Sequence, residues 1–267
     1  MKPLVTWLLL LFAAIHQASA AERAAEVVAV RPSGDAVPEN LLRISIVFDR
    51  STGDAILPRL RLVKADGAEI DRPFLDEELW SPDGKILTVL FNPGRVKSGV
   101  GPNEQYGRAL AAGENVRLVL DGRLIKSWRV GPPTNRGLDL ALWKIVPPVA
   151  GSDSVLVVDF GRPIDALDTS FLMVATADGK PVPGKAELTH AETVWTFSPG
   201  RPWPSGHYLL FARGDLEDPC GNTPLAAFEM NGDGDLANHG PFVLPFSVVR
   251  AIQAYTGDRN VPFDRHR

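Results

Sequence analysis

The stretch Arg43-Ile44-Ser45-Ile46-Val47-Phe48 alternates apolar and polar side chains for most of its length, which is typical of a β-strand with one face in solvent. Similar short apolar runs recur along the chain, separated by glycine (24 residues) and proline (23 residues), and helical periodicity is almost missing. The chain is therefore predicted to be all-β, built as a sandwich or barrel of short strands. The other runs are Val27–Val30, Leu60–Val63, Ile86–Phe91, Val116–Leu120, Ser127–Val130, Val155–Phe160, Phe171–Ala175, Val194–Phe197, Tyr208–Ala212, Ala226–Met230 and Val243–Val249.

Landmarks of the first half of the chain return in the second half in the same order. The matched segments are Phe48-Asp49-Arg50 with Phe160-Gly161-Arg162, Ala65-Asp66-Gly67 with Ala177-Asp178-Gly179, and Phe91-Asn92-Pro93-Gly94-Arg95 with Phe197-Ser198-Pro199-Gly200-Arg201. The first two matches share an offset of 112 residues and the third has an offset of 106. Such a repeat indicates one duplicated module, so we expect two β-sandwiches in tandem.

The proline- and glycine-rich stretch Gly131-Pro132-Pro133-Thr134-Asn135-Arg136-Gly137 is too rich in these residues to form a strand or a helix. We expect a first sandwich over residues 25–130, a linker over 131–140 and a second sandwich over 141–249. Residues 250–267 mix charged and isolated apolar side chains, and we expect them to form a C-terminal tail.

The first twenty residues have the three-part layout of a secretory signal. Lys2 precedes the apolar run Leu4–Ile15, and the small residues Ala18-Ser19-Ala20 follow. An apolar run of 12 residues is shorter than the roughly 20 that a membrane-spanning helix needs. We therefore expect residues 1–20 to be a cleaved signal peptide and the rest to be exported, to the periplasm or the cell surface, without a membrane span.

Residues 143–249 resemble the bacterial immunoglobulin-like family found in S-layer and other surface proteins. The resemblance rests on Phe160 with Pro163-Ile164-Asp165, on Trp195-Thr196-Phe197-Ser198-Pro199, on Trp203-Pro204-Ser205-Gly206-His207-Tyr208 and on Asp218-Pro219-Cys220-Gly221-Asn222. It is weaker over residues 25–130. It implies two tandem immunoglobulin-like β-sandwich domains that serve as spacer, adhesion or recognition modules, and it brings no catalytic residues.

Charge and cysteine content exclude several classes of function. Without Lys2 the chain has 27 basic against 32 acidic residues and no long basic run, so we expect neither nucleic acid nor an anionic membrane surface as a partner. Cys220 is the single cysteine, so no disulfide can form within the chain, and we interpret it as a small buried or turn residue. No nucleophile motif accompanies the histidines, and we expect no catalytic residue and no cofactor.

Two groups of residues are candidates for binding. Asn231, Asp233 and Asp235 place oxygen atoms on alternate residues as a calcium loop does, but Leu236 and Phe242 stand where such a loop needs glycine and glutamate. We therefore interpret this run as a turn and expect no metal. Trp80 and Trp203 lie beside proline-containing turns, where we expect both side chains to be partly exposed. Exposed tryptophan rings can stack on sugar rings, so these two residues are candidates for carbohydrate binding.

The sequence thus predicts an exported, non-enzymatic protein with a structural, adhesion or binding role at the cell envelope, whose partner is an unidentified protein or glycan. The alternative is an accessory module that binds or processes polysaccharide. Exposure of Trp80 and Trp203 on one face would favour a sugar-binding module, whereas a cleft with paired carboxylates would favour a hydrolase.

Overall fold

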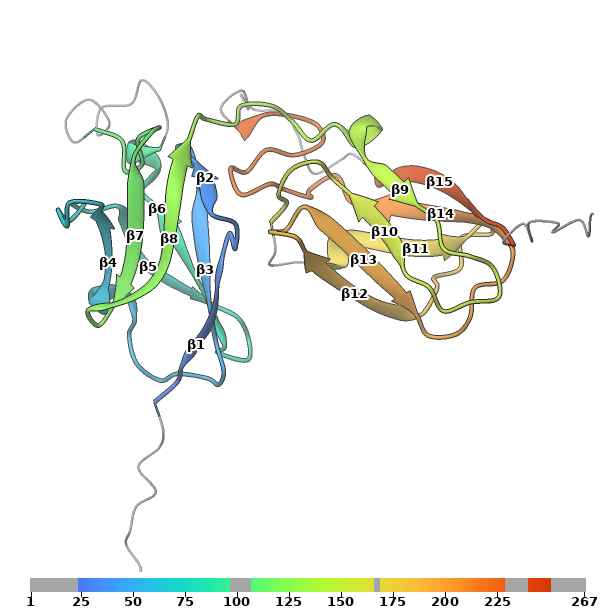
Figure 1. The fold of residues 1–267 in the computed structure, drawn as a ribbon, viewed down its shortest axis with the longest axis horizontal. Coiled ribbons are helices and arrows are strands. Elements are labelled where there is room, and N and C mark those ends of the chain that lie inside the picture. The colour runs from blue at the N-terminus through green and yellow to red at the C-terminus, as the bar shows by residue number, and fades with distance from the viewer. Residues whose placement is uncertain (1–23, 97–106, 166–168, 229–239, 251–267) are drawn as a thin grey trace, which may run out of the picture.

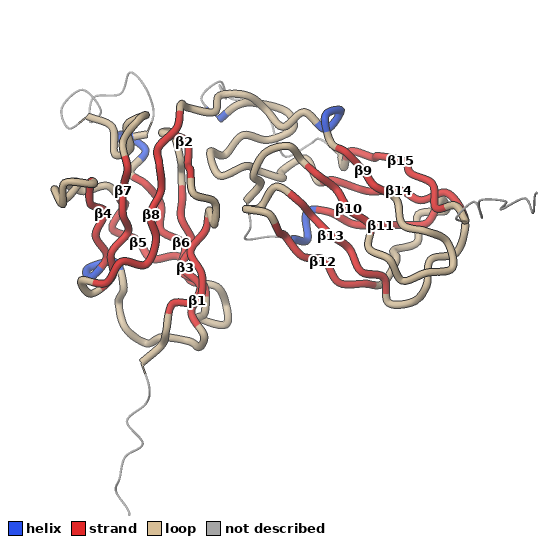
Figure 2. The backbone as a smooth tube through the Cα atoms, in the orientation of Figure 1, coloured by secondary structure: helices blue, strands red, loops and turns tan. Residues whose placement is uncertain are grey.

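The computed structural model describes residues 24–96, 107–165, 169–228 and 240–250. Within these ranges the chain forms fifteen β-strands and four single-turn 3₁₀ segments, and no α-helix. No helix in the described parts is long and apolar enough to cross a membrane. Figures 1 and 2 show the strands gathered in two separate groups, one from each half of the chain. The chain is all-β, as its sequence predicts.

The first group of strands is a two-layer sandwich, which we call the N-terminal sandwich. One sheet has the order β1-β3-β6-β5 and the other the order β2-β8-β7-β4. The strands are β1 (Val27–Arg31), β2 (Ala36–Pro38), β3 (Arg43–Phe48), β4 (Leu60–Lys64), β5 (Phe74–Trp80), β6 (Ile86–Phe91), β7 (Asn115–Leu120) and β8 (Arg123–Gly131). Inward-facing residues of both sheets, such as Ile46, Val89 and Leu118, form one hydrophobic core.

The second group, which we call the C-terminal sandwich, has the sheets β9-β10-β13-β12 and β11-β14-β15. The strands are β9 (Lys144–Val146), β10 (Leu156–Asp159), β11 (Leu172–Thr176), β12 (Gly184–Thr189), β13 (Val194–Pro199), β14 (Gly206–Ala212) and β15 (Phe242–Val248). Their core is separate from the first and is rich in aromatic rings. Trp203 packs edge-on against Tyr208 at 5.3 Å between ring centroids, and Tyr208 stacks on Phe246 at 5.5 Å.

Both sandwiches connect their strands in the same order. With strands lettered along the chain, the order A-B-E-D in one sheet and C-F-G in the other describes β9 to β15, and it also describes the N-terminal sandwich once the short strand β2 is set aside. This is the strand order of an immunoglobulin constant-type sandwich. The hydroxyl of Tyr208, on the F strand, donates to the carbonyl of Pro204 at 3.0 Å, which is the tyrosine corner of that fold.

Most of the strands lie where the apolar runs predict them, with two kinds of difference. The run Ala226–Met230 was expected to be a strand, but residues 226–228 are irregular, and the remainder lies outside the described residues. Four strands were not expected: β2, β5, β9 and β12. All four lie at the edge of a four-stranded sheet and have at most one buried residue each, so they lack the apolar run that marks a central strand.

Candidate ligand pocket and the joint between the sandwiches

Polar side chains of the two sandwiches meet at a contact that we call the joint, and a pocket lies at the opposite end of the C-terminal sandwich. The turn between β12 and β13 and the loop after β14 reach the N-terminal sandwich at residues of β1 and β3. The other end of β13 leads to the pocket. The joint and the pocket therefore lie at opposite ends of β13.

Glu192, in the turn between β12 and β13, joins this turn to the N-terminal sandwich. Its side chain is 2% exposed, and its two carboxylate oxygens accept from the guanidinium of Arg31 at 2.6 Å and from the backbone N–H of Ser33 at 2.9 Å. The turn residues His190, Ala191 and Glu192 all have positive φ, a conformation that costs free energy in non-glycine residues. The contacts of the carboxylate help to hold this strained turn in place.

Arg43, at the start of β3, lies between two carboxylates of the C-terminal sandwich. Its guanidinium forms an ion pair with Asp165 at 2.5 Å and a second with Glu217. Burial lowers the pKa of Arg43, but the charges of Asp165 and Glu217 outweigh it, so the net effect raises the pKa. Arg43 is therefore held charged at the joint, with both partners on the other sandwich.

Asp218 organises the turn Asp218–Asn222, one of the segments on which the family resemblance rests. Its Oδ1 accepts from the backbone N–H groups of Cys220 (2.8 Å) and Asn222 (2.9 Å). Its Oδ2 accepts from the side-chain amide of Asn222 (2.9 Å) and from Arg162 (2.8 Å). Burial raises the pKa of the Asp218 carboxyl, although these hydrogen bonds and the charge of Arg162 oppose the shift.

The Asp218–Asn222 turn contacts the N-terminal sandwich through Asn40 and Leu42. The thiol of Cys220 donates to Oδ1 of Asn40 at 3.3 Å, and the backbone N–H of Leu42 donates to the carbonyl of Pro219 at 3.0 Å. Cys220 is 1% exposed, in agreement with its interpretation as a buried turn residue. Sequence reasoning identified this turn but not its partners, because Asn40 and Cys220 are 180 residues apart.

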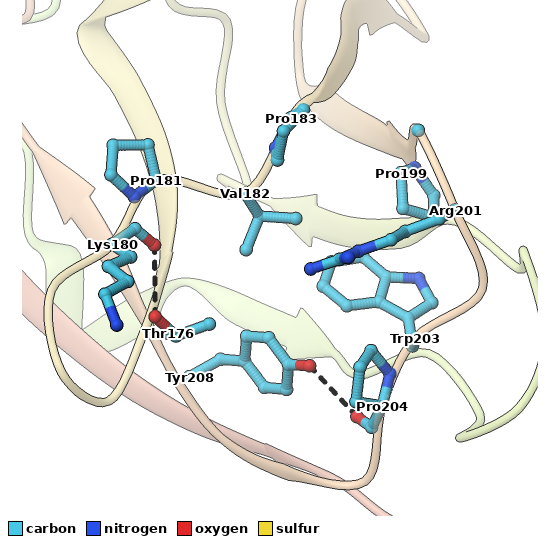
Figure 3. A pocket seen from close by; sticks show the side chains of 11 residues that line it. Thr176, Lys180, Pro181, Val182, Pro183, Pro199, Arg201, Trp203, Pro204 and Tyr208 are labelled. Carbon is cyan, nitrogen blue, oxygen red and sulfur yellow. Dashed lines mark hydrogen bonds between the residues drawn. The ribbon is translucent and has the colours of Figure 1, made fainter.

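The pocket has a volume of about 420 Å³ and lies between the β11–β12 loop and the β13–β14 loop (Figure 3). Its floor contains Trp203 and Tyr208, and four prolines contribute to its walls. The lining residues are Thr176, Lys180, Pro181, Val182, Pro183, Pro199, Gly200, Arg201, Trp203, Pro204 and Tyr208. The size falls within the range of small-molecule pockets, which is about 300 to 1,000 Å³.

The charges of the pocket come from Arg201 and Lys180, both exposed at its rim. Lys180 pairs with Asp178 at 2.7 Å, and this contact, followed by the hydrogen bond from Thr176, lowers the pKa of Asp178 to about 2. Burial raises the pKa of the Tyr208 phenol, and the charge of Arg201 acts in the opposite direction. The phenol therefore stays neutral at ordinary pH and the pocket carries positive charge at its rim.

The structure places the two candidate tryptophans in different sandwiches and in different surroundings. Trp203 was expected to be partly exposed, and this expectation is wrong: the residue is 1% exposed because its ring inserts into the aromatic core and its Nε1–H donates to the carbonyl of Ser154 at 2.8 Å. Trp80 is half-buried, packs against Phe48 and donates to Glu78 at 2.9 Å. They share no common face. Asn231, Asp233 and Asp235 lie outside the described residues.

No family model matches the chain, and no curated protein matches it. Among solved structures, an L,D-transpeptidase from Mycobacterium smegmatis is 16% identical, with a TM-score of 0.28, over 61% of this chain and 64% of that one. Domains 5–6 of the S-layer protein SbsC are 12% identical, with a TM-score of 0.24, over 86% and 99%. The Escherichia coli adhesin FdeC is 12% identical, with a TM-score of 0.23, over 84% and 63%.

The chain spans less than two thirds of the length of the transpeptidase and of the adhesin. At these identities and TM-scores the likeness carries no argument about activity or partners. The neighbours include an S-layer protein and a surface adhesin, as the resemblance of residues 143–249 implies, but no family model assigns the chain to that family. The immunoglobulin-like strand order is read from the sheets of this chain itself.

Proposed function

We propose that the protein is an exported, non-enzymatic binding component of the cell envelope. In this proposal, residues 25–130 and 141–249 are two immunoglobulin-like modules that the joint holds in one relative orientation, so that the far end of the C-terminal sandwich is presented to a ligand. The predicted signal peptide supports export. The resemblance to surface proteins supports a role in the envelope, with a protein or glycan as the class of partner.

The observation that carries the proposal is the buried polar network of the joint. Domains joined by a linker usually move relative to one another unless their interface is large or well satisfied. Here the linker itself is bound, because the backbone N–H of Leu138 donates to the carbonyl of Thr223 at 2.9 Å and the carbonyl of Thr134 accepts from Asn222 at 2.8 Å. Asn40, Asp218 and Asn222, each at most 3% exposed, take part in this network. A spacer that presents a site at a fixed distance needs such a joint.

The single cysteine gives a direct test, since Cys220 lies in the joint and no other thiol can react. In the folded protein without the predicted signal peptide (residues 1–20), Cys220 should react with a thiol reagent only as fast as the joint or the whole protein opens. Fast labelling under native conditions would contradict a closed joint. Fractionation of the cells that make the protein tests export in parallel, and retention of the tagged chain in the cytoplasm would contradict the envelope role.

A further inference from the structure

The pocket at the far end of the C-terminal sandwich exposes mainly proline surface above the buried rings of Trp203 and Tyr208, and it has few free hydrogen-bonding side chains. The polar atoms of both aromatic rings are already engaged, because Trp203 donates to Ser154 and Tyr208 donates to Pro204. The four prolines Pro181, Pro183, Pro199 and Pro204 have no backbone N–H. The pocket wall is therefore apolar, and contact with it favours an apolar body.

Backbone donors near the pocket are engaged as well. The N–H of Val182 donates to Val174, that of Gly200 donates to Pro183 and that of Trp203 donates to Ser152, each at 2.8 Å. The hydroxyl of Thr176 donates to Asp178 at 2.5 Å. Among the side chains of the pocket, the donors left for a ligand are the guanidinium of Arg201 and the remaining hydrogens of the Lys180 ammonium group.

Arg201 is the free cation of this pocket. Among the described residues no carboxylate forms an ion pair with it, whereas Lys180 is held by Asp178. Figure 3 shows the Arg201 side chain extending across the mouth of the pocket on the Trp203 side. A guanidinium presents two parallel N–H donors that match a carboxylate. An unpaired guanidinium beside an apolar pocket is thus complementary to a molecule that has a carboxylate next to an apolar body.

We propose that this pocket binds a small carboxylic acid with an apolar aliphatic or aromatic body. The carboxylate pairs with Arg201 and the body lies against Tyr208 and the prolines. A neutral sugar fits the pocket poorly, because its hydroxyl groups would lose water without finding partners in the wall. This inference deepens the proposed binding function and rests on it, and it differs from the polysaccharide alternative in the chemistry of the ligand.

The test is an NMR titration of the ¹⁵N-labelled protein, without the predicted signal peptide (residues 1–20), with the probe 3-phenylpropionate. Amide shifts that move in a saturable way at Val182, Gly200 and Arg201 are expected. Arg201→Gln should weaken binding about tenfold, because the charge-assisted pair is lost. Arg123→Gln makes the same chemical change on the exposed start of β8 in the N-terminal sandwich, and it should leave binding unchanged.

Three comparisons can overturn the inference. Equal binding of the neutral 3-phenylpropanamide, or of N-acetylglucosamine, would contradict recognition of a carboxylate. Equal binding by the Arg201→Gln variant would remove Arg201 from the site. Binding of a tetrapeptide that ends in phenylalanine without binding of 3-phenylpropionate would show that the occupant is a peptide end and not a small acid. If Cys220 is unreactive but the protein binds none of these probes, this inference is overturned. The proposed envelope role would then still stand.

Discussion

The side chain of Asn40 and the backbone of Thr134 form a reciprocal pair of hydrogen bonds. The Asn40 amide donates to the Thr134 carbonyl at 3.1 Å, and the Thr134 N–H donates back to Oδ1 of Asn40 at 2.9 Å. Asn40 is 3% exposed and Thr134 is half-buried, so both bonds are partly shielded from water. Since the same Oδ1 also accepts from the Cys220 thiol, one side chain connects the N-terminal sandwich, the linker and the C-terminal sandwich.

Replacement of Asn40 by alanine should open the joint. The backbone N–H of Thr134 would lose its partner in a partly buried site, which costs about 1 kcal/mol in the free energy of unfolding. Cys220 should then react several times faster with a thiol reagent in native buffer. Asn115→Ala, at an exposed position of β7, is the matched control and should change neither quantity. Unchanged labelling of the Asn40→Ala variant would show that Asn40 does not hold the joint closed.

Replacement of Arg43 by glutamine should loosen the joint at its second contact. The change removes the positive charge that Arg43 supplies to Asp165 and Glu217, and the Asp165 side chain is only 12% exposed. We expect small-angle scattering to report a broader distribution of distances between the sandwiches, with unchanged strand content by circular dichroism. Arg61→Gln, which breaks the exposed pair of Arg61 with Glu69 at 3.0 Å, is the control. Identical scattering from both variants would argue against a clamp at Arg43.

Gly221 is predicted to accept a side chain only at a cost in stability. It has a φ of +75°, and a Cβ atom there would lie 2.5 Å from Cδ1 of Leu42 on the other sandwich. Gly221→Ala should therefore destabilise the protein by more than the about 1 kcal/mol that the backbone conformation alone costs. Gly179→Ala isolates that backbone cost, because Gly179 has a φ of +81° and open space around it. Equal melting temperatures of the two variants would mean that the joint yields at Leu42 without cost.

Much of the fold can be predicted from the sequence, because central strands carry apolar runs such as Ile86–Phe91 between turn residues. Edge strands cannot be found in this way. The strand β5 contains the exposed residues Asp76 and Glu77, which an edge strand tolerates because one of its sides has no partner strand. The charged residues that hide the strand from a hydrophobic pattern also discourage pairing with other chains.

The candidate site was harder to predict. Trp203 stands between Pro202 and Pro204, a context typical of exposed turns. Its Nε1–H instead donates to the carbonyl of Ser154, 49 residues earlier, and a local sequence pattern does not show such a partner. The sequence marks Arg201 only by its match to Arg95 in the repeat. That match does not predict a role at a pocket, because Arg95 is buried and donates to the carbonyl of Gly107 at 2.8 Å. The same landmark therefore serves the core in one sandwich and the pocket rim in the other.

Removal of the Lys180 charge should raise the pKa of Asp178. This pKa is lowered to about 2 from the ordinary 3.8, first by Lys180 and then by Thr176. A lowered pKa means that the stabilising contribution is present above pH 3.8 and is lost as the pH falls toward 2. Lys180→Gln should move the carboxyl ¹³C titration of Asp178 upward, whereas Lys185→Gln on the exposed face of β12 should not. An unmoved titration in Lys180→Gln would assign the shift to Thr176 alone.

Asp218 should show the opposite dependence on pH. Burial raises its pKa above 3.8 in the folded state, against the hydrogen bonds from Asn222 and the charge of Arg162. A raised pKa means that its contribution to stability is full below pH 3.8 and declines as the pH rises through the folded-state pKa. The free energy of unfolding of the wild type, minus that of Asp218→Asn, should therefore shrink as the pH rises from 3.8 and then level off.

In the Asp218→Asn variant, the remaining side-chain oxygen can still accept from the N–H groups of Cys220 and Asn222. The new NH₂ group, however, faces the donors Arg162 and Asn222 and cannot accept from them. The variant should be less stable than the wild type throughout, by about 2 to 4 kcal/mol. Other acidic groups titrate equally in both proteins, so the difference isolates Asp218. A difference that grows with pH would mean that Arg162 and the four hydrogen bonds outweigh burial, and that the joint is held by a carboxylate whose ionised form is favoured by folding.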